Sequence, residues 1–269
     1  MKQPASGLVP DVLLHIPHAS SVIPLEHRHR FVLDDAALNH ELLKVTDWFT
    51  DELFTLGGAE RLVFGVSRLL VDPERFSDDA QEIMAGRGLG AVYTRTHDGK
   101  LLKSAGGRDE LIAAFYAPHH RAFNTWAAAA LDAHGRCLII DCHSFPTKPM
   151  PCDLDQTPER PDYCIGSDGF HTPSRIVQAA TDAIEALDHV AGGGKHTVLV
   201  NRPYAGSIVP SDYYGRDPRV CSMMIEVNRA LYMNEESGER SAGFEKCKTD
   251  LTQVLESVTE AWAKGSRPS

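Results

Sequence analysis

Two histidines that follow short apolar runs could present ligands to a metal ion. His18 comes directly after the run Asp11–Pro17, and His143 directly after Cys137–Cys142. Imidazole is a common ligand of zinc and similar divalent cations. Asp141 lies two residues before His143, so on a strand both side chains point to one face, where the carboxylate could orient the imidazole. The alternatives are a loop role for His18 and a purely structural pair of Asp141 with His143.

Two acidic residues lie in apolar stretches of the sequence, where a solvent-exposed acid is not expected. Glu226 interrupts the apolar run Val220–Val227, and a buried ionised carboxylate is costly unless a cation or a cavity accompanies it. It is therefore a candidate general base, and the alternative is an ion pair with Arg229 or with another arginine at the edge of the sheet. Asp47 is bracketed by apolar residues of a predicted helix and could complete a two-histidine, one-carboxylate metal site. A surface pair with Lys44 is its alternative.

Arginines that follow predicted strands offer a way to hold an anionic substrate. Arg75, Arg202 and Arg229 each occupy such a position. Guanidinium groups grip planar carboxylates through paired hydrogen bonds. Any one of the three could be a structural ion pair, but together they indicate at least one substrate contact.

The composition is that of an ordinary globular protein. The chain has 269 residues, of which 42% are hydrophobic and 24% charged, and 37 acidic against 27 basic residues give a formal charge of −10. This charge argues against binding to nucleic acid or to anionic membranes, and an anionic substrate would need local positive charge. No segment approaches the roughly 18 to 20 apolar residues of a membrane span.

The cysteines and the N-terminus bear on the cellular compartment. Met1–Pro10 holds one lysine and no apolar core, unlike a secretory signal. The six cysteines include no CxxC pair, and Cys137, Cys142 and Cys221 sit in apolar runs, where reduced thiols are expected. We therefore expect a cytoplasmic protein.

Short apolar runs alternate with longer helical patterns, which predicts an α/β fold with a mostly parallel sheet covered by helices. No repeat or linker divides the chain, so residues 1–269 are expected to form a single domain, with sites at the carboxyl ends of its strands. The predicted strands are Asp11–Pro17, Leu62–Val66, Arg68–Val71, Cys137–Cys142, Tyr163–Ile165, Thr197–Val200 and Val220–Val227. The predicted helices are Asp35–Leu56, Asp109–Leu131, Pro173–Leu187 and Glu239–Ala263.

A series of short motifs runs in order from about residue 12 to residue 232. They are His15–Ser20, Thr46–Asp47, Arg68–Arg75, Tyr116–His120, Asp141–Ser144, Asp162–Gly166 with Asp168–Gly169, Asn201–Gly206 and Ile225–Arg229. In order and spacing they resemble the N-formylglutamate amidohydrolase (N-formylglutamate deformylase) family, which is similar to the zinc carboxypeptidases and aspartoacylase. The resemblance implies a single α/β domain with a mixed, mostly parallel sheet of the carboxypeptidase type, and one catalytic divalent metal, expected to be zinc.

The resemblance also implies roles for individual residues. Metal binding falls to His18, Asp47 and His143, acid–base catalysis to Glu226, and substrate binding to Arg75, Arg202 and Asn201. The sequence departs from the related proteins at two positions. The carboxypeptidases place a carboxylate ligand three residues after the first histidine, where this chain has Ser21, and Glu74 stands where the family often has asparagine.

These roles predict metal-dependent hydrolysis of N-formyl-L-glutamate to formate and L-glutamate, a reaction of histidine degradation. The substrate would be a small anionic acyl amino acid, with neither nucleic acid nor membrane as a partner and with the oligomeric state left open. One alternative is a zinc amidohydrolase acting on another N-acyl amino acid, a γ-glutamyl compound or a cell-wall amide. Others are a non-catalytic binding module on the same fold and a hydrolase that uses Cys142 or Ser144 as nucleophile.

Overall fold

Six strands form one sheet within the residues that the computed structural model describes, which are 10–104, 106–189 and 193–265. The strands are β1 (Val12–Ile16), β2 (Glu60–Val63), β3 (Cys137–Phe145), β4 (Tyr163–Gly166), β5 (Val198–Val200) and β6 (Val220–Asn228). Their order across the sheet is β2-β1-β3-β6-β4-β5. In this sheet β4 and β6 pair antiparallel, and the other neighbours pair in parallel. The expected α/β fold with a mixed, mostly parallel sheet is confirmed. Of the segment Met1–Pro10, all but Pro10 lies outside the described residues.

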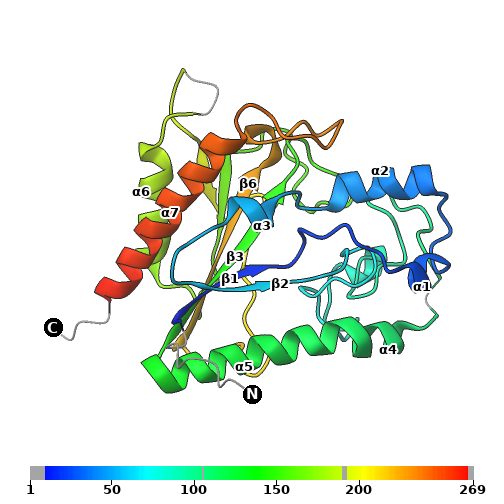
Figure 1. The fold of residues 1–269 in the computed structure, drawn as a ribbon, viewed down its shortest axis with the longest axis horizontal. Helices are drawn as coiled ribbons and strands as arrows, with labels where there is room; N and C mark the ends of the chain where they lie inside the picture. The colour runs from blue at the N-terminus through cyan, green and yellow to red at the C-terminus, as the bar shows by residue number, and fades with distance from the viewer. Residues whose placement is uncertain (1–9, 105, 190–192, 266–269) are drawn as a thin grey trace, which may run out of the picture.

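Alternate side chains of the central strands bury the two faces of the sheet. In β3, Leu138 and Ile140 belong to one apolar cluster, whereas Cys137 and Ile139 belong to another. The first cluster includes residues of α6 and α7, and the second includes residues of α5. Figure 1 shows these layers, with α6 and α7 on one side of the sheet and α5 on the other. The three helices are α5 (Ala117–His134), α6 (Ser174–Ala186) and α7 (Phe244–Lys264).

The predicted helix Asp35–Leu56 is divided into α2 (Asp35–Val45) and α3 (Thr50–Leu53). Its start is as expected, because the side chain of Asp34 accepts a hydrogen bond from the backbone N–H of Ala37 and caps α2. The end of α2 is earlier than the apolar spacing indicates.

The expectation that Asp47 lies on a helix is wrong, because Asp47 falls in the break between α2 and α3. Thr46 is extended, and Phe49 adopts the left-handed conformation with φ 65°. The backbone N–H of Asp47 donates to the carbonyl oxygen of His18 at 3.0 Å instead of to the preceding helical turn. This tertiary hydrogen bond ties Asp47 to the segment that follows β1.

Other elements differ from the prediction at their ends or in kind. The expected strand Arg68–Val71 is a turn, in which the N–H groups of Leu70 and Val71 donate to the carbonyl of Ser67. The expected helix Asp109–Leu131 consists of α4 (Arg108–Leu111), the π-helical turn Ile112–Tyr116 and most of α5. The remaining elements are α1 (Leu25–Arg28) and the 3₁₀ turns Ala85–Arg87 and Arg229–Leu231.

A second lobe of the fold lies beside the carboxyl ends of the strands. A separate apolar cluster joins α2, through Leu38 and Val45, to the long connection after β2, through Leu69 and Val71. It fixes the connection that carries residues 72–76 next to the sheet. Across the described ranges, no helix is long and apolar enough to cross a membrane. The six cysteines are unpaired, and five of them are buried.

Candidate active site and metal centre

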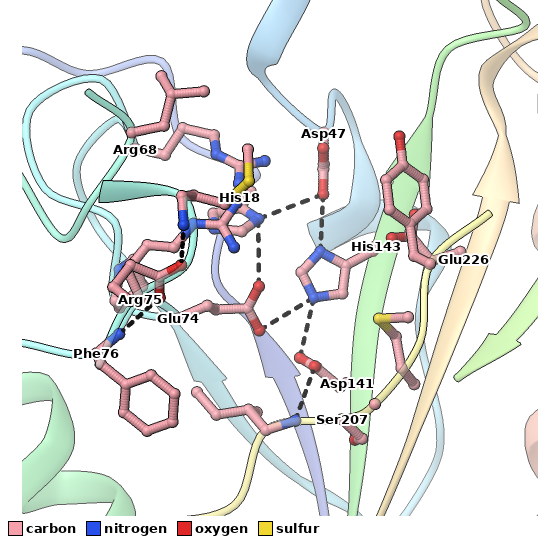
Figure 2. Close-up of a pocket in the computed structure, with 18 of the residues that line it drawn as sticks. His18, Asp47, Arg68, Glu74, Arg75, Phe76, Asp141, His143, Ser207 and Glu226 are labelled. Carbon is pink, nitrogen blue, oxygen red and sulfur yellow. Dashed lines mark hydrogen bonds and ion pairs between the residues drawn. The ribbon is translucent and has the colours of Figure 1, made fainter. Parts of the chain in front are cut away.

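A cavity of about 800 Å³ opens at the carboxyl ends of β1, β3 and β6. Its walls include His18 after β1, His143 on β3 and Glu226 on β6, together with residues of the connection after β2. The prediction that chemistry-bearing residues gather at this edge of the sheet therefore holds for these three side chains. Figure 2 shows His18 and His143 both directed toward Asp47 and Glu74, with Glu226 beside His143.

The two histidines singled out in the sequence lie against each other. The ring centroids of His18 and His143 are 5.0 Å apart. Their exposed fractions are 1% and 4%. Such buried imidazoles need polar partners on every side, and carboxylates supply them here.

One nitrogen of each ring is held by a buried carboxylate. His18 Nε2 donates to Asp72 Oδ1 at 2.9 Å, and His143 Nε2 lies 3.1 Å from Asp141 Oδ1. Asp141 thus contacts the histidine two residues on, as the strand alternation predicts, and it also pairs with His15 Nδ1 at 2.9 Å. Of the remaining carboxylates, Asp47 faces the Nδ1 atoms of both rings, whereas Glu74 faces His18 Nδ1 and His143 Nε2.

Asp47 lies between the two Nδ1 atoms. Its Oδ2 is 3.0 Å from His143 Nδ1 and 3.6 Å from His18 Nδ1. Its Oδ1 is 3.1 Å from Nη2 of Arg229, whose side chain also donates to the carbonyl of Lys44. Asp47 therefore pairs with Arg229 and not with the lysine side chain, and the ion pair of Arg229 within the described residues is with Asp47 and not with Glu226. The structure brings the three predicted ligands His18, Asp47 and His143 together.

Glu74 is a further carboxylate at the same centre. Its Oε2 lies 3.6 Å from His18 Nδ1, and its Oε1 lies 3.1 Å from His143 Nε2. One ligand atom each from His18, Glu74 and His143 fits within 4.8 Å, close enough to share a metal ion. The sequence offered Glu74 only as a departure from the family pattern. Glu74 lies two residues after Asp72, in a motif that follows a buried segment. This position could have indicated that Glu74 belongs to the site.

Negative charge dominates this centre. Burial alone would raise the pKa of Asp47, but the hydrogen bonds with His143 and His18 outweigh it and hold that pKa well below its usual range. Burial would lower the pKa of His143, but the charges of Glu74 and Asp141 raise it well above its usual value. The cluster therefore favours a positive charge among its ligand atoms, which a proton or a metal cation can supply.

Glu226 faces the same cavity from β6, in register with His143 on β3. It is 7% exposed. Within the described part of the chain its Oε2 has no hydrogen-bond partner. Burial raises the pKa of Glu226 to about 8, with neighbouring carboxylates adding to the effect against the charge of His143. A carboxyl group in this state exchanges a proton near neutral pH.

Two arginines, Arg68 and Arg75, line the cavity beside the histidines and give this side a positive charge. Arg68 Nη2 lies 2.9 Å from Asp72 Oδ2, and Arg75 Nε lies 3.6 Å from the same oxygen. Tyr93 donates its hydroxyl to that oxygen at 2.7 Å. Both arginines line the cavity, and the side chain of Arg75 keeps 26% of its surface exposed. Arg68 was missed in the sequence because the expected strand placed it inside the sheet.

The other predicted substrate residues lie elsewhere. Arg202 Nε pairs with Asp155 Oδ2 at 3.1 Å, and its side chain is 54% exposed. Asn201 hydrogen-bonds through its amide to the backbone and hydroxyl of Ser167. Neither residue lines the cavity, although the following residues from Pro203 onward do.

Comparisons with known proteins bear on this arrangement. A family model described as N-formylglutamate amidohydrolase matches residues 10–233. A search of the curated proteins gives no match. Among solved structures, this one is similar to N-formylglutamate amidohydrolase from Ralstonia eutropha JMP134, with a TM-score of 0.76 and 21% identity over 96% of each chain. It is also similar to the gene product Atu2144 from Agrobacterium tumefaciens, with a TM-score of 0.59 and 19% identity over 93% of this chain and 91% of that one. At these identities the two structures support the fold.

Proposed function

Because the chain belongs to the N-formylglutamate amidohydrolase family, we propose that it hydrolyses N-formyl-L-glutamate to formate and L-glutamate with the help of one divalent cation. This is the reaction of histidine degradation that the sequence motifs imply. The observation that carries the proposal is the meeting of His18, His143 and Glu226 in one cavity.

The side chains present fit a divalent cation. His18 Nδ1 is buried and, among the described residues, has no hydrogen-bond partner, although two carboxylates face it at 3.6 Å. Ligand histidines commonly donate their second ring N–H to a carboxylate, and His18 and His143 have Asp72 and Asp141 in that position. We infer that His18, Asp47 and His143 hold the cation, with zinc as the expected metal. Glu74 is a further candidate ligand, because its carboxylate lies within 4.8 Å of ligand atoms of both histidines.

When bound, such a cation lowers the pKa of a coordinated water and polarises the formyl carbonyl. Glu226 Oε2 accepts the proton of the attacking water and then delivers it to the amine nitrogen of the departing glutamate. The Oε2 atom suits both steps, because among the described residues it has no hydrogen-bond partner that would compete with the proton. Glu74 faces both histidines from the open side of the cluster and keeps them oriented.

Arg75 and Arg68 bind the carboxylates of the substrate in this proposal. Both line the cavity, and Arg75 is the more exposed of the two. Their charge opposes the field of a protein with a formal charge of −10. A bidentate contact would place the formyl group toward the histidines.

Replacement of Glu226 by glutamine tests the proposed function. The amide keeps the shape of the side chain but cannot accept a proton, so kcat for N-formyl-L-glutamate should fall by about 10²- to 10⁴-fold while zinc content stays unchanged. Glu256→Gln, on the exposed surface of α7, is the matched control and should keep full activity. Normal turnover in Glu226→Gln would remove Glu226 from the reaction.

The size of the cavity favours a second candidate within the same chemistry. A volume of about 800 Å³ suits a drug-sized ligand, whereas N-formylglutamate is much smaller. Phe76, Ile83, Leu154 and Tyr214 line the cavity with exposed apolar surface. An N-acyl amino acid with a longer acyl chain would cover that surface. A panel of N-formyl, N-acetyl and longer N-acyl glutamates and aspartates, compared by kcat/KM, decides between the two.

We also infer a cytoplasmic location. Support comes from the six unpaired cysteines, of which five are buried and suited to a reducing compartment.

A further inference from the structure

A second group of metal-ligating side chains lies outside the cavity. Asp162 precedes β4, His189 follows α6, and His196 precedes β5. One ligand atom from each lies within 4.8 Å of the others. None of the three lines the catalytic cavity, so the proposed hydrolysis makes no use of them.

The geometry of the cluster is that of a carboxylate between two imidazoles. His189 Nε2 lies 3.4 Å from Asp162 Oδ1, and His196 Nδ1 lies 3.5 Å from Asp162 Oδ2. The two imidazole rings are 4.8 Å apart at their centroids. These separations are too long for good hydrogen bonds. They are close to the roughly 3.3 Å that separates two ligand atoms of a tetrahedral zinc ion with bonds of about 2.0 to 2.1 Å.

His196 is a buried imidazole with unused nitrogens. Its exposed fraction is 3%. Over the residues described, neither ring nitrogen has a hydrogen-bond partner. Buried polar atoms are nearly always hydrogen-bonded, so two bare nitrogens on one ring require an explanation. Nδ1 is aimed at Asp162, and Nε2 lies 3.6 Å from Asp250 Oδ2 on α7.

Asp250 gives the ring the outer partner that a ligand histidine requires. Its carboxylate is fixed by Lys246 Nζ, at 2.9 and 2.8 Å from its two oxygens. With a cation at Nδ1, the proton of His196 sits on Nε2 and points at this carboxylate. A carboxylate–histidine–metal arrangement of this kind fixes the tautomer and raises the basicity of the ligand nitrogen.

The backbone around the cluster is held in place. The N–H and hydroxyl of Thr197 both donate to Asp162 Oδ2, at 2.8 and 3.0 Å. The N–H of His189 donates to the carbonyl of Gly194 at 2.9 Å, which ties His189 to the residues just before His196. The side chains of His189 and Asp162 are 28% and 19% exposed, so an ion can reach the cluster from solvent.

We propose that Asp162, His189 and His196 form a second, structural binding site for a zinc-like divalent cation. The cation would join His189, just after α6, and His196, just before β5, to the start of β4. Three protein ligands leave one position for water. By itself this cluster accounts for one zinc equivalent per chain, whatever reaction the cavity performs. Together with the catalytic cation of the proposed function, the chain should bind two.

Zinc titration of the metal-stripped protein tests the proposal, with calorimetry and elemental analysis as readouts. Wild type should bind two equivalents of Zn²⁺, and His189→Ala should lose one of them while keeping its activity on N-formyl-L-glutamate. His40→Ala, which removes an exposed histidine from α2, is the matched control and should bind as wild type. His189 is partly exposed, so its replacement should leave the fold intact.

The variant His143→Ala separates this site from the cavity. It should lose the other equivalent and still bind one Zn²⁺, with a rise in Tm on zinc addition that disappears in His143→Ala/His189→Ala. Equal zinc stoichiometry in wild type and His189→Ala, or no zinc-dependent rise in Tm in His143→Ala, would overturn the second site. Full activity in His143→Ala, with this equivalent still bound, would instead count against the proposed function alone.

Discussion

Glu226→Gln should make the metal-free protein more stable at neutral pH. Burial raises the pKa of this carboxyl from 4.5 to about 8. At pH 7 the unfolded chain has released the proton, about 2.5 pH units above its pKa, whereas the folded chain retains it. At about 1.4 kcal/mol per pH unit, Glu226 lowers the stability of the fold by about 3 kcal/mol. Glutamine carries no charge in either state and removes this cost.

The sign of the effect sets its pH dependence. Because the pKa is higher in the folded state, the cost is absent below about pH 4.5, grows as the pH rises, and levels off above about pH 8. A gain of about 3 kcal/mol corresponds to a rise in Tm of about 6 to 12 °C for a protein of this size. The assay is thermal unfolding of chelator-treated protein between pH 4.5 and 8, with Glu256→Gln as the control for glutamine in general.

Two results would refute this reasoning. A Glu226→Gln variant with no higher Tm than wild type at pH 7 would mean that burial of the carboxyl costs nothing. A gain in Tm that stays the same down to pH 4.5 would mean that it does not come from the charge of the Glu226 carboxylate. We therefore expect Glu226→Gln to lose turnover and to gain stability at the same time. Such a trade between activity and stability is common at catalytic residues.

Two further substitutions test the surroundings of the centre. Arg75→Ala should lower kcat/KM for N-formyl-L-glutamate by about 10- to 100-fold, the worth of a charged hydrogen bond, whereas Arg202→Ala should change it little; equal effects would contradict the assignment of Arg75. Asp47→Asn should destabilise the fold by about 3 to 5 kcal/mol in urea unfolding, because Arg229, which is 3% exposed, loses the partner of its charge. Asp51→Asn, at an exposed position of α3, is its control, and similar unfolding midpoints for the two variants would contradict the role of that ion pair.

The sequence predicts the central sheet well because buried strands appear as apolar runs. Where polar residues end such runs, as at His18, His143 and Glu226, parallel strand ends bring them together. The pattern could not place Asp47. Apolar residues keep helical spacing through Val45 and beyond it, but a hydrogen bond to the distant carbonyl of His18 ends the helix. Contacts between residues this far apart in the chain leave no mark in the local spacing.

The loops account for the rest of the differences. Arg202 follows a strand as expected, yet it turns toward Asp155, while Tyr204 of the same loop lines the cavity. The sequence of a loop without periodicity does not indicate which side chain faces inward. Glu74 illustrates the same limit, since its two contacts come from His18 and His143 on other elements.

The central claim is that one divalent cation, bound by His18, Asp47 and His143, is required for hydrolysis in this cavity. Its most direct test uses the His189→Ala variant, because this variant lacks the second cluster. The metal is removed with a chelator, Zn²⁺ is titrated back, and the release of L-glutamate from N-formyl-L-glutamate is measured. The account predicts no turnover without metal and full turnover at one equivalent per chain. Undiminished hydrolysis by the metal-free protein would contradict it.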